Sequence, residues 1–157
     1  MIVIRQHDLA GEAPRGLVAL HLAEMHAFSP PGHVFALDSS GLMAPDVTVW
    51  TAWIGADIAG MAALRQLSGI GEIKSMRTHP QHLRKGVATA LLEHIIAEAR
   101  ARGLERVSLE TGSGPAFEPA LALYRKRGFR EGEPFGGYVR SDFNQFLHFV
   151  LAGASGG

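Results

Sequence analysis

The clearest hydrophobic pattern in the chain lies between residues 72 and 102, where an apolar segment leads through a basic turn into a long periodic segment. From residue 87 onward the apolar positions recur at intervals of one, three and four, at Val87, Ala88, Leu91, Leu92, Ile95, Ile96 and Ala99. This period places them on one face of an amphipathic helix. We therefore predict a helix that packs this face on a sheet and ends at Arg102-Gly103, because glycine commonly follows the last helical turn.

The basic turn before this helix predicts an anion site. Arg84, Lys85 and Gly86 stand just ahead of the first helical positions, where backbone N–H groups have no partner inside the helix. Helix starts of this kind bind phosphate, and glycine lets the backbone approach a ligand closely. Taken without the helix, the two cations would fit a solvated basic turn equally well.

Apolar runs and turn signals predict the remaining elements. Pro30-Pro31 must end the first helix, and Gly55-Ala56-Asp57 indicates a hairpin between two apolar strands. A strand that follows a helical crossover is expected to lie parallel to its neighbour. The order of elements indicates an α/β protein of the α+β type with a mixed, mostly antiparallel sheet. Strands are predicted over 1–5, 47–55, 58–67, 72–78, 106–111, 129–135 and 143–151, and further helices over 17–28, 39–43 and 116–127.

Composition narrows the class of protein. The 157 residues, 46% hydrophobic and 19% charged, are typical of one soluble domain, which we place at 1–152 with a flexible tail at 153–157. Fifteen basic and fifteen acidic residues balance, so the charge does not favour nucleic acid or a membrane surface as partner. The absence of cysteine excludes disulfides and thiolate chemistry and fits a reducing compartment. With no signal-peptide pattern or long apolar run, we expect a cytoplasmic protein.

Eight histidines raise the question of a metal site. The closest pairs are His79 with His82 and His21 with His26, and neither has a third ligand at a suitable spacing. We interpret these histidines as surface side chains and predict no metal.

Two motifs resemble the GCN5-related N-acetyltransferase (GNAT) superfamily, which uses acetyl-CoA. Residues 84–88, RKGVA, are similar to the pyrophosphate loop Q/R-x-x-G-x-G/A, and residues 120–129, ALALYRKRGF, are similar to the helix A-x-x-L-Y-x-x-x-G-F. The resemblance covers about 47–151, and segments 72–77, 109–112 and 134–138 resemble a subgroup of small bacterial acetyltransferases. The chain departs from the family at Leu83, where Gln or Arg is usual, and at Phe117, where many members carry Asn.

The resemblance implies a GNAT-like sheet with helices on both faces and a site for acetyl-CoA. One strand would offer its unpaired backbone to the pantetheine arm, while the basic turn would surround the pyrophosphate. Phe117 stands where many members carry Asn, so its ring would stack or pack on the cofactor in place of an amide contact. The implied cofactor residues are Met76, Arg77, Thr78, Arg84, Lys85, Gly86, Val87, Ala88, Thr89 and Phe117.

Acetyl transfer to an amine needs a base, stabilisation of the developing oxyanion and a proton for the leaving thiolate. By resemblance, Glu72 faces the acetyl group and takes the amine proton directly or through a water molecule, and Tyr124 protonates the coenzyme A thiolate. Glu72 would otherwise be a surface carboxylate after a turn, and Tyr124 a tyrosine packed on the sheet. Glu110, at the end of a strand, is a second base candidate or a solvent-facing carboxylate.

Lys74 lies two residues from Glu72 and so shares its face of the strand. It would bind a substrate carboxylate, or pair with Glu72 or Glu110 and keep the base ionised. Family acceptor sites use the early helices and the last loop, which adds His33, Phe35, Leu37, Tyr138 and Arg140 as acceptor-pocket candidates. Trp50 and Trp53 lie on opposite faces of one strand, one in the core and the other a candidate neighbour of the acceptor.

These features predict an N-acetyltransferase that transfers the acetyl group of acetyl-CoA directly to a small-molecule amine. Two alternatives remain open, namely a catalytically silent acyl-CoA-binding or sensing module and an enzyme that acetylates peptides or proteins. Relatives of this kind are commonly dimers, so a homodimer is included among the expectations.

Overall fold

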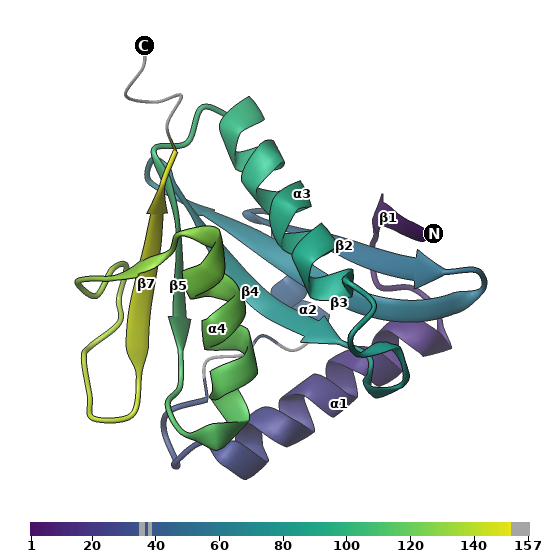
Figure 1. Cartoon of the computed structure of the whole chain (residues 1–157), viewed down its shortest axis with the longest axis horizontal. Coiled ribbons are helices and arrows are strands. Elements are labelled where there is room, and N and C mark those ends of the chain that lie inside the picture. The colour runs from purple at the N-terminus through teal and green to yellow at the C-terminus, as the bar shows by residue number, and fades with distance from the viewer. Residues whose placement is uncertain (35–36, 38, 152–157) are drawn as a thin grey trace.

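The computed structural model describes residues 1–34, 37 and 39–151 and has the predicted fold class (Figure 1). Seven strands form one sheet in the order β1-β2-β3-β4-β5-β7-β6, and only β4 and β5 pair in parallel. The strands are β1 (Ile2–Gln6), β2 (Val47–Ile54), β3 (Asp57–Leu67), β4 (Ile70–Thr78), β5 (Arg106–Thr111), β6 (Arg130–Glu131) and β7 (Gln145–Val150). The helices are α1 (Glu12–Phe28), α2 (Ser39–Leu42), α3 (Val87–Ala101) and α4 (Glu118–Arg127), with 3-10 turns at Pro80–His82 and Pro115–Phe117.

Helices cover both faces of the sheet (Figure 1). The periodic face of α3 and Leu121 of α4 pack on one side, against Ile73 of β4 and Val107 of β5. On the other side α1 and α2 pack through Leu17, Val18 and Leu42 on Val49, Met61 and Ala63. Successive strand residues point to opposite faces, so β2 and β3 contribute to both cores. None of the described helices is long and apolar enough to cross a bilayer.

β4 and β5 separate after a short parallel contact. Only Ile70, Gly71 and Glu72 of β4 pair with β5, while the rest of β4 continues along β3. The register of β3 and β4 shifts opposite Ser75, which has a φ of 56° and forms a bulge. The edge of β4 that faces β5 is therefore unpaired beyond Glu72 and borders the cavity described below.

Gly60 allows α3 to begin close to the sheet. A Cβ atom on Gly60 would lie 2.7 Å from Cγ1 of Val87 and 2.9 Å from the carbonyl oxygen of Arg77. Both distances are shorter than real Cβ contacts, so a side chain at this position would push the first turn of α3 away from β3 and β4.

Several predicted boundaries are wrong. The first helix begins at Glu12 rather than Leu17, and the second predicted motif helix begins as a 3-10 turn before α4. The strand predicted over 129–135 is only Arg130–Glu131, because Gly132 packs on His148 and Pro134 has no N–H for a ladder. The tail predicted at 153–157 lies outside the described residues.

Candidate active site

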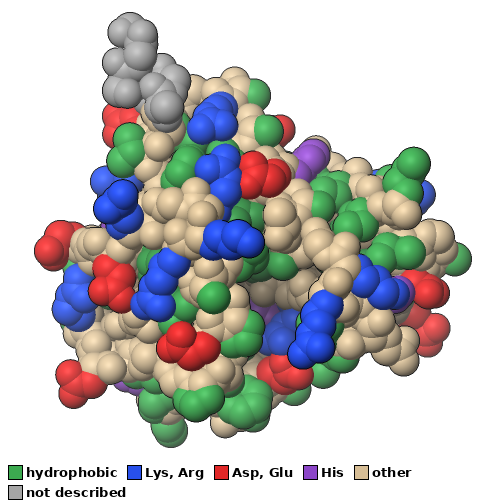
Figure 2. All heavy atoms as spheres, in the orientation of Figure 1, with side chains coloured by type: hydrophobic (Ala, Val, Ile, Leu, Met, Phe, Trp, Pro, Cys, Tyr) green, Lys and Arg blue, Asp and Glu red, His purple; other side chains and the backbone are tan. Residues whose placement is uncertain are grey.

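A cavity of about 680 Å³ opens where β4 and β5 separate. Its walls come from β4, β5, α1, α4 and the turn before α3. Figure 2 shows the corresponding hollow beside α4, with basic side chains at its edge. Nine of the ten predicted cofactor residues line it, namely Met76, Arg77, Thr78, Arg84, Gly86, Val87, Ala88, Thr89 and Phe117.

The start of α3 forms one end of the cavity. Gly86 is the N-cap in the left-handed region, with φ 83°, and no side chain caps the helix. The first N–H groups of α3 are therefore available to an anion in the cavity. Lys85, the tenth predicted residue, does not line the cavity, because its Nζ lies 3.1 Å from Nδ1 of His82.

The side chain of Arg77 joins β4 to α1 at the cavity wall. Its Nε donates to Nδ1 of His21 at 3.0 Å, and its guanidinium also binds the carboxylate of Glu24. Burial, and then the charge of Arg77, lower the pKa of His21 to about 4, so this imidazole is neutral and can accept the hydrogen bond. The prediction of surface histidines is wrong for His21 and also for His82, both of which are buried.

Tyr124 of α4 lines the cavity and packs against Phe129, with ring centroids 5.6 Å apart. Burial raises the pKa of its phenol, so the hydroxyl keeps its proton. Within the described part of the chain, no hydrogen bond involves this hydroxyl, so it can donate to a ligand. Nearby, Phe117 and Phe143 pack so closely over Gly112 that any Cβ atom there would clash with both rings.

Glu72 lies in a buried cluster with Lys74 and Tyr138. The Tyr138 hydroxyl donates to Oε2 of Glu72 at 2.5 Å and accepts from Nζ of Lys74 at 2.8 Å. Nζ of Lys74 is also 3.6 Å from Oε2 of Glu72, which confirms the predicted pairing. Glu72 is only 1% exposed and does not line the cavity, and its buried Oε1 has no hydrogen-bond partner among the described residues. The interpretation of Glu72 as a surface carboxylate is therefore wrong.

Glu110 of β5, in contrast, lines the cavity. Burial raises its pKa to about 7, the charge of Lys74 opposes this effect and the charge of Glu72 adds to it. No hydrogen bond or ion pair within the described residues holds the carboxylate of Glu110. An accessible carboxylate with a pKa near neutrality has the properties of a general base at physiological pH. The same burial lowers the pKa of Lys74, against the charges of Glu72 and Glu110.

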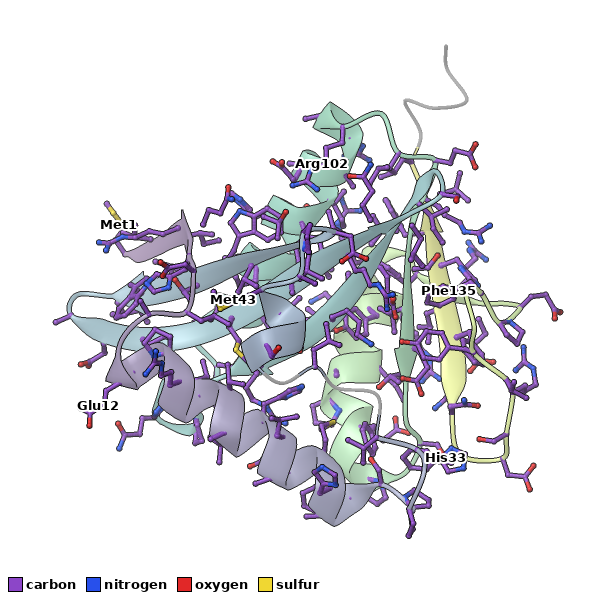
Figure 3. The ribbon with its side chains drawn as sticks, turned by 180° about the vertical axis from the view of Figure 1, so that it is seen from behind. Met1, Glu12, His33, Met43, Arg102 and Phe135 are labelled. Carbon is purple, nitrogen blue, oxygen red and sulfur yellow. The ribbon has the colours of Figure 1, made fainter. Side chains whose placement is uncertain are left out.

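The acceptor-pocket candidates lie in different parts of the structure, some on the cavity wall and others away from it. His33 follows α1 (Figure 3) and lines the cavity, with its ring edge-to-face against Phe143 at 5.8 Å. Arg140 is exposed and donates to the carbonyl oxygen of Gly132, and neither it nor Tyr138 lines the cavity. Phe35 lies outside the described residues, and Leu37 packs against the core beneath α1 and α2.

Trp50 is buried beside α3, and Trp53 packs near His7 under the guanidinium of Arg5. Trp53 does not line the cavity, so the prediction that it borders the acceptor is wrong. Sequence reasoning missed Met25, Ser29, Ser75 and Phe143, which do line it. Of these four residues, only Ser75 could have been predicted, because it lies between Lys74 and Met76 in the sequence. Among the described residues, no group of three histidines or acidic side chains could hold a metal ion.

Comparison with known proteins found a matching family and similar relatives. A family profile described as the acetyltransferase (GNAT) family matches residues 16–129. The uncharacterized N-acetyltransferase YsnE of Bacillus subtilis is 51% identical over 92% of this chain and 96% of the relative. The uncharacterized N-acetyltransferase YedL of Escherichia coli is 43% identical over 96% of both chains. The IAA acetyltransferase of Azospirillum brasilense is 36% identical over 73% of this chain and 75% of the relative.

Solved structures share the fold at low sequence identity. A proposed acyl-CoA N-acyltransferase of Klebsiella pneumoniae has a TM-score of 0.77 and 24% identity, over 96% of this chain and 98% of the other. A Bacillus subtilis acetyltransferase in complex with CoA has a TM-score of 0.67 and 18% identity, over 96% and 99% of the two chains.

Proposed function

Because the chain belongs to the acetyltransferase (GNAT) family, we propose that it transfers the acetyl group of acetyl-CoA directly to the amine of a small molecule. The observation that carries this proposal is one continuous cavity with an uncapped helix start at one end and Glu110 and Tyr124 on its walls. Such a cavity can hold an anionic cofactor and an amine together, as direct transfer requires.

In the proposed binding mode the pyrophosphate of coenzyme A lies at the start of α3. The N–H groups of the first turn bind its oxygens, Gly86 lets the backbone approach, and Arg84 contributes charge. The pantetheine arm lies along the unpaired edge of β4 near Met76, as an additional strand would. Lys85 has no part in this arrangement, since its ammonium group contacts His82.

We assign the role of base to Glu110 and not to Glu72. Glu110 lines the cavity with a pKa of about 7, whereas Glu72 lies behind Tyr138 and Lys74. The carboxylate of Glu110 takes the proton of the amine, and the nitrogen attacks the carbonyl carbon of the thioester. The hydroxyl of Tyr124 donates to the departing thiolate, and β4 backbone near Met76 donates to the developing oxyanion.

The acceptor is proposed to be a small amine that needs no carboxylate for binding. The cations on this side of the cavity are already engaged, Lys74 by Glu72 and Tyr138 and Arg77 by Glu24 and His21. Arg140, the other cation among the acceptor-pocket candidates, does not line the cavity. The apolar edges of Met25 and Phe143 favour an acceptor with an apolar body, and the A. brasilense relative supports a small-molecule acceptor.

The test is to incubate the protein with acetyl-CoA and a panel of amines and to measure both free thiol and acetylated product by mass spectrometry. Because the chain has no cysteine, every free thiol comes from coenzyme A. The panel pairs each amino acid with the amine that lacks its carboxylate. We expect each amine to be acetylated at least as fast as the corresponding amino acid. Product on peptides alone would favour the peptide-acetylating alternative, and coenzyme A binding without any product would favour the sensing module.

A further inference from the structure

Glu72 is the most buried acidic side chain of the cluster, yet it lies outside the cavity. A buried carboxylate is costly unless nearby groups stabilise its charge. Here two groups do so, the Tyr138 hydroxyl at 2.5 Å and the ammonium group of Lys74 at 3.6 Å. Tyr138 also accepts from Lys74 and lies beneath it, with Nζ 5.5 Å from the ring centroid. The three side chains therefore form one unit that fixes the position of the Lys74 charge.

Lys74 is the cation that acts on Glu110. Both side chains line the cavity, on adjacent strands at the point where β4 and β5 separate. The charge of Lys74 lowers the pKa of Glu110, so the two groups interact, but they form no ion pair. If Lys74 turned to Glu110, it would hold the carboxylate in its ionised form and occupy the oxygens that an amine must reach.

The geometry points to Glu72 as a positioning residue for the acetyl transfer: its buried carboxylate, held by Tyr138, engages Lys74 and so keeps Glu110 unpaired toward the amine. Glu72 does not touch substrate in this account. It acts through Lys74, and its effect is on the basicity and accessibility of Glu110. This inference rests on the proposed function, in which Glu110 is the base.

Other titratable or charged groups of the described residues lie in or beside this part of the cavity. They are Glu72, Lys74 and Arg77 of β4, Arg65 of β3, Tyr138 of the last loop, His21 of α1, His33 after it, and Tyr124 of α4, and the test below changes only Glu72 and Lys74 among them. Of these, only Glu72 and Lys74 alter the pKa of Glu110 by their charge.

Two isosteric or near-isosteric variants, Glu72→Gln and Lys74→Gln, have opposite expected effects. Glu72→Gln removes the negative charge beside Lys74, so Glu110 becomes the carboxylate that Lys74 pairs with, and the pKa of Glu110 falls. Lys74→Gln removes the cation, and the pKa of Glu110 rises above its value in the wild type. The readout is a ¹³C NMR titration of the glutamate carboxyl carbons, in which Glu110 is identified by its absence from Glu110→Gln.

We expect a titration midpoint near pH 7 for Glu110 in the wild type and a midpoint at least about one pH unit lower in Glu72→Gln. In the Lys74→Gln background, Glu72→Gln should lower the midpoint much less, because the cation that moves is absent. Val139→Ala serves as the control, since Val139 is adjacent to Tyr138 but 80% exposed, and it should leave the midpoint unchanged. An unchanged or higher midpoint in Glu72→Gln overturns the inference.

The pH profile of acetyl transfer supplies a second readout that a purely structural role of Glu72 would not move. In Glu72→Gln the acid limb of kcat/KM should move to lower pH together with the NMR midpoint. Complete loss of transfer at every pH, with the midpoint of Glu110 unchanged, would make Glu72 the base and overturn the inference. Failure of the proposed function would give a different result. The wild type would then transfer no acetyl group to any amine, while the NMR midpoints of Glu110 in wild type and variants would still differ as expected.

Discussion

Replacing Glu110 by glutamine should stabilise the protein while it removes the proposed base. Glu110 has an ordinary pKa of 4.5 and a folded-state pKa of about 7, raised mainly by burial. A carboxyl whose pKa is raised on folding favours the folded state below pH 4.5, and this contribution is lost as the pH rises through 7. Above pH 7 the wild type therefore carries an ionised and poorly solvated carboxylate in the folded state.

The magnitude follows from the two pKa values. The difference between about 7 and 4.5, at about 1.4 kcal/mol for each pH unit, corresponds to about 3.5 kcal/mol as an upper value at high pH. Glutamine has nearly the same shape and carries no charge, so the variant should regain most of this free energy. For a domain of this size, about 3 kcal/mol corresponds to a rise in Tm of about 6 to 12 °C.

The assay is denaturant unfolding of wild type and Glu110→Gln at pH 5 and pH 9. We expect nearly equal free energies of unfolding at pH 5 and a more stable variant at pH 9. Glu133→Gln removes an exposed carboxylate of the same type and serves as the control, with no pH-dependent difference expected. An equal difference between Glu110→Gln and wild type at both pH values would refute the reasoning about burial of Glu110.

Three further predictions concern the walls of the cavity. Tyr124→Phe should lower kcat by about a hundredfold with little change in coenzyme A affinity measured by calorimetry, and unchanged turnover would remove Tyr124 from the mechanism. Gly86→Leu forces a branched side chain into the left-handed region and should weaken coenzyme A binding about tenfold or more, so equal affinity would contradict the phosphate assignment. Gly60→Ala should lower the free energy of unfolding by about 1–3 kcal/mol, because its Cβ meets Val87 and the carbonyl of Arg77, and wild-type stability would show that α3 can shift without cost.

Sequence periodicity was sufficient for most of the fold, because the elements concerned have strong local signals. The apolar stripe of α3 and the turn at Gly55 determine a helix and a hairpin without reference to distant residues. The strand predicted over 129–135 was too long, because the apolar residues Phe129 and Phe135 at its two ends are typical of a strand. In the structure, Phe135 packs against Phe146 and Tyr138 as part of a loop.

Most of the residues predicted for the cofactor line the cavity, and they could be found from the sequence because they belong to short continuous motifs. The arrangement of charges around the proposed base was not predictable, since Tyr138 reaches Glu72 from 66 residues further along the chain. Likewise, the partners of Arg77 are more than 50 residues away in α1. Which of two carboxylates faces the cavity depends on such distant contacts, which the family resemblance that favoured Glu72 over Glu110 does not describe.

Whether Glu110 is the base can be measured from the pH dependence of kcat/KM for acetyl transfer to an accepted amine, in wild type and in Glu110→Gln. We expect a wild-type acid limb near pH 7 and a variant that lacks this limb and is slower by about a hundredfold or more above it. A variant with the wild-type limb and the wild-type rate would contradict the claim that Glu110 takes the proton of the amine.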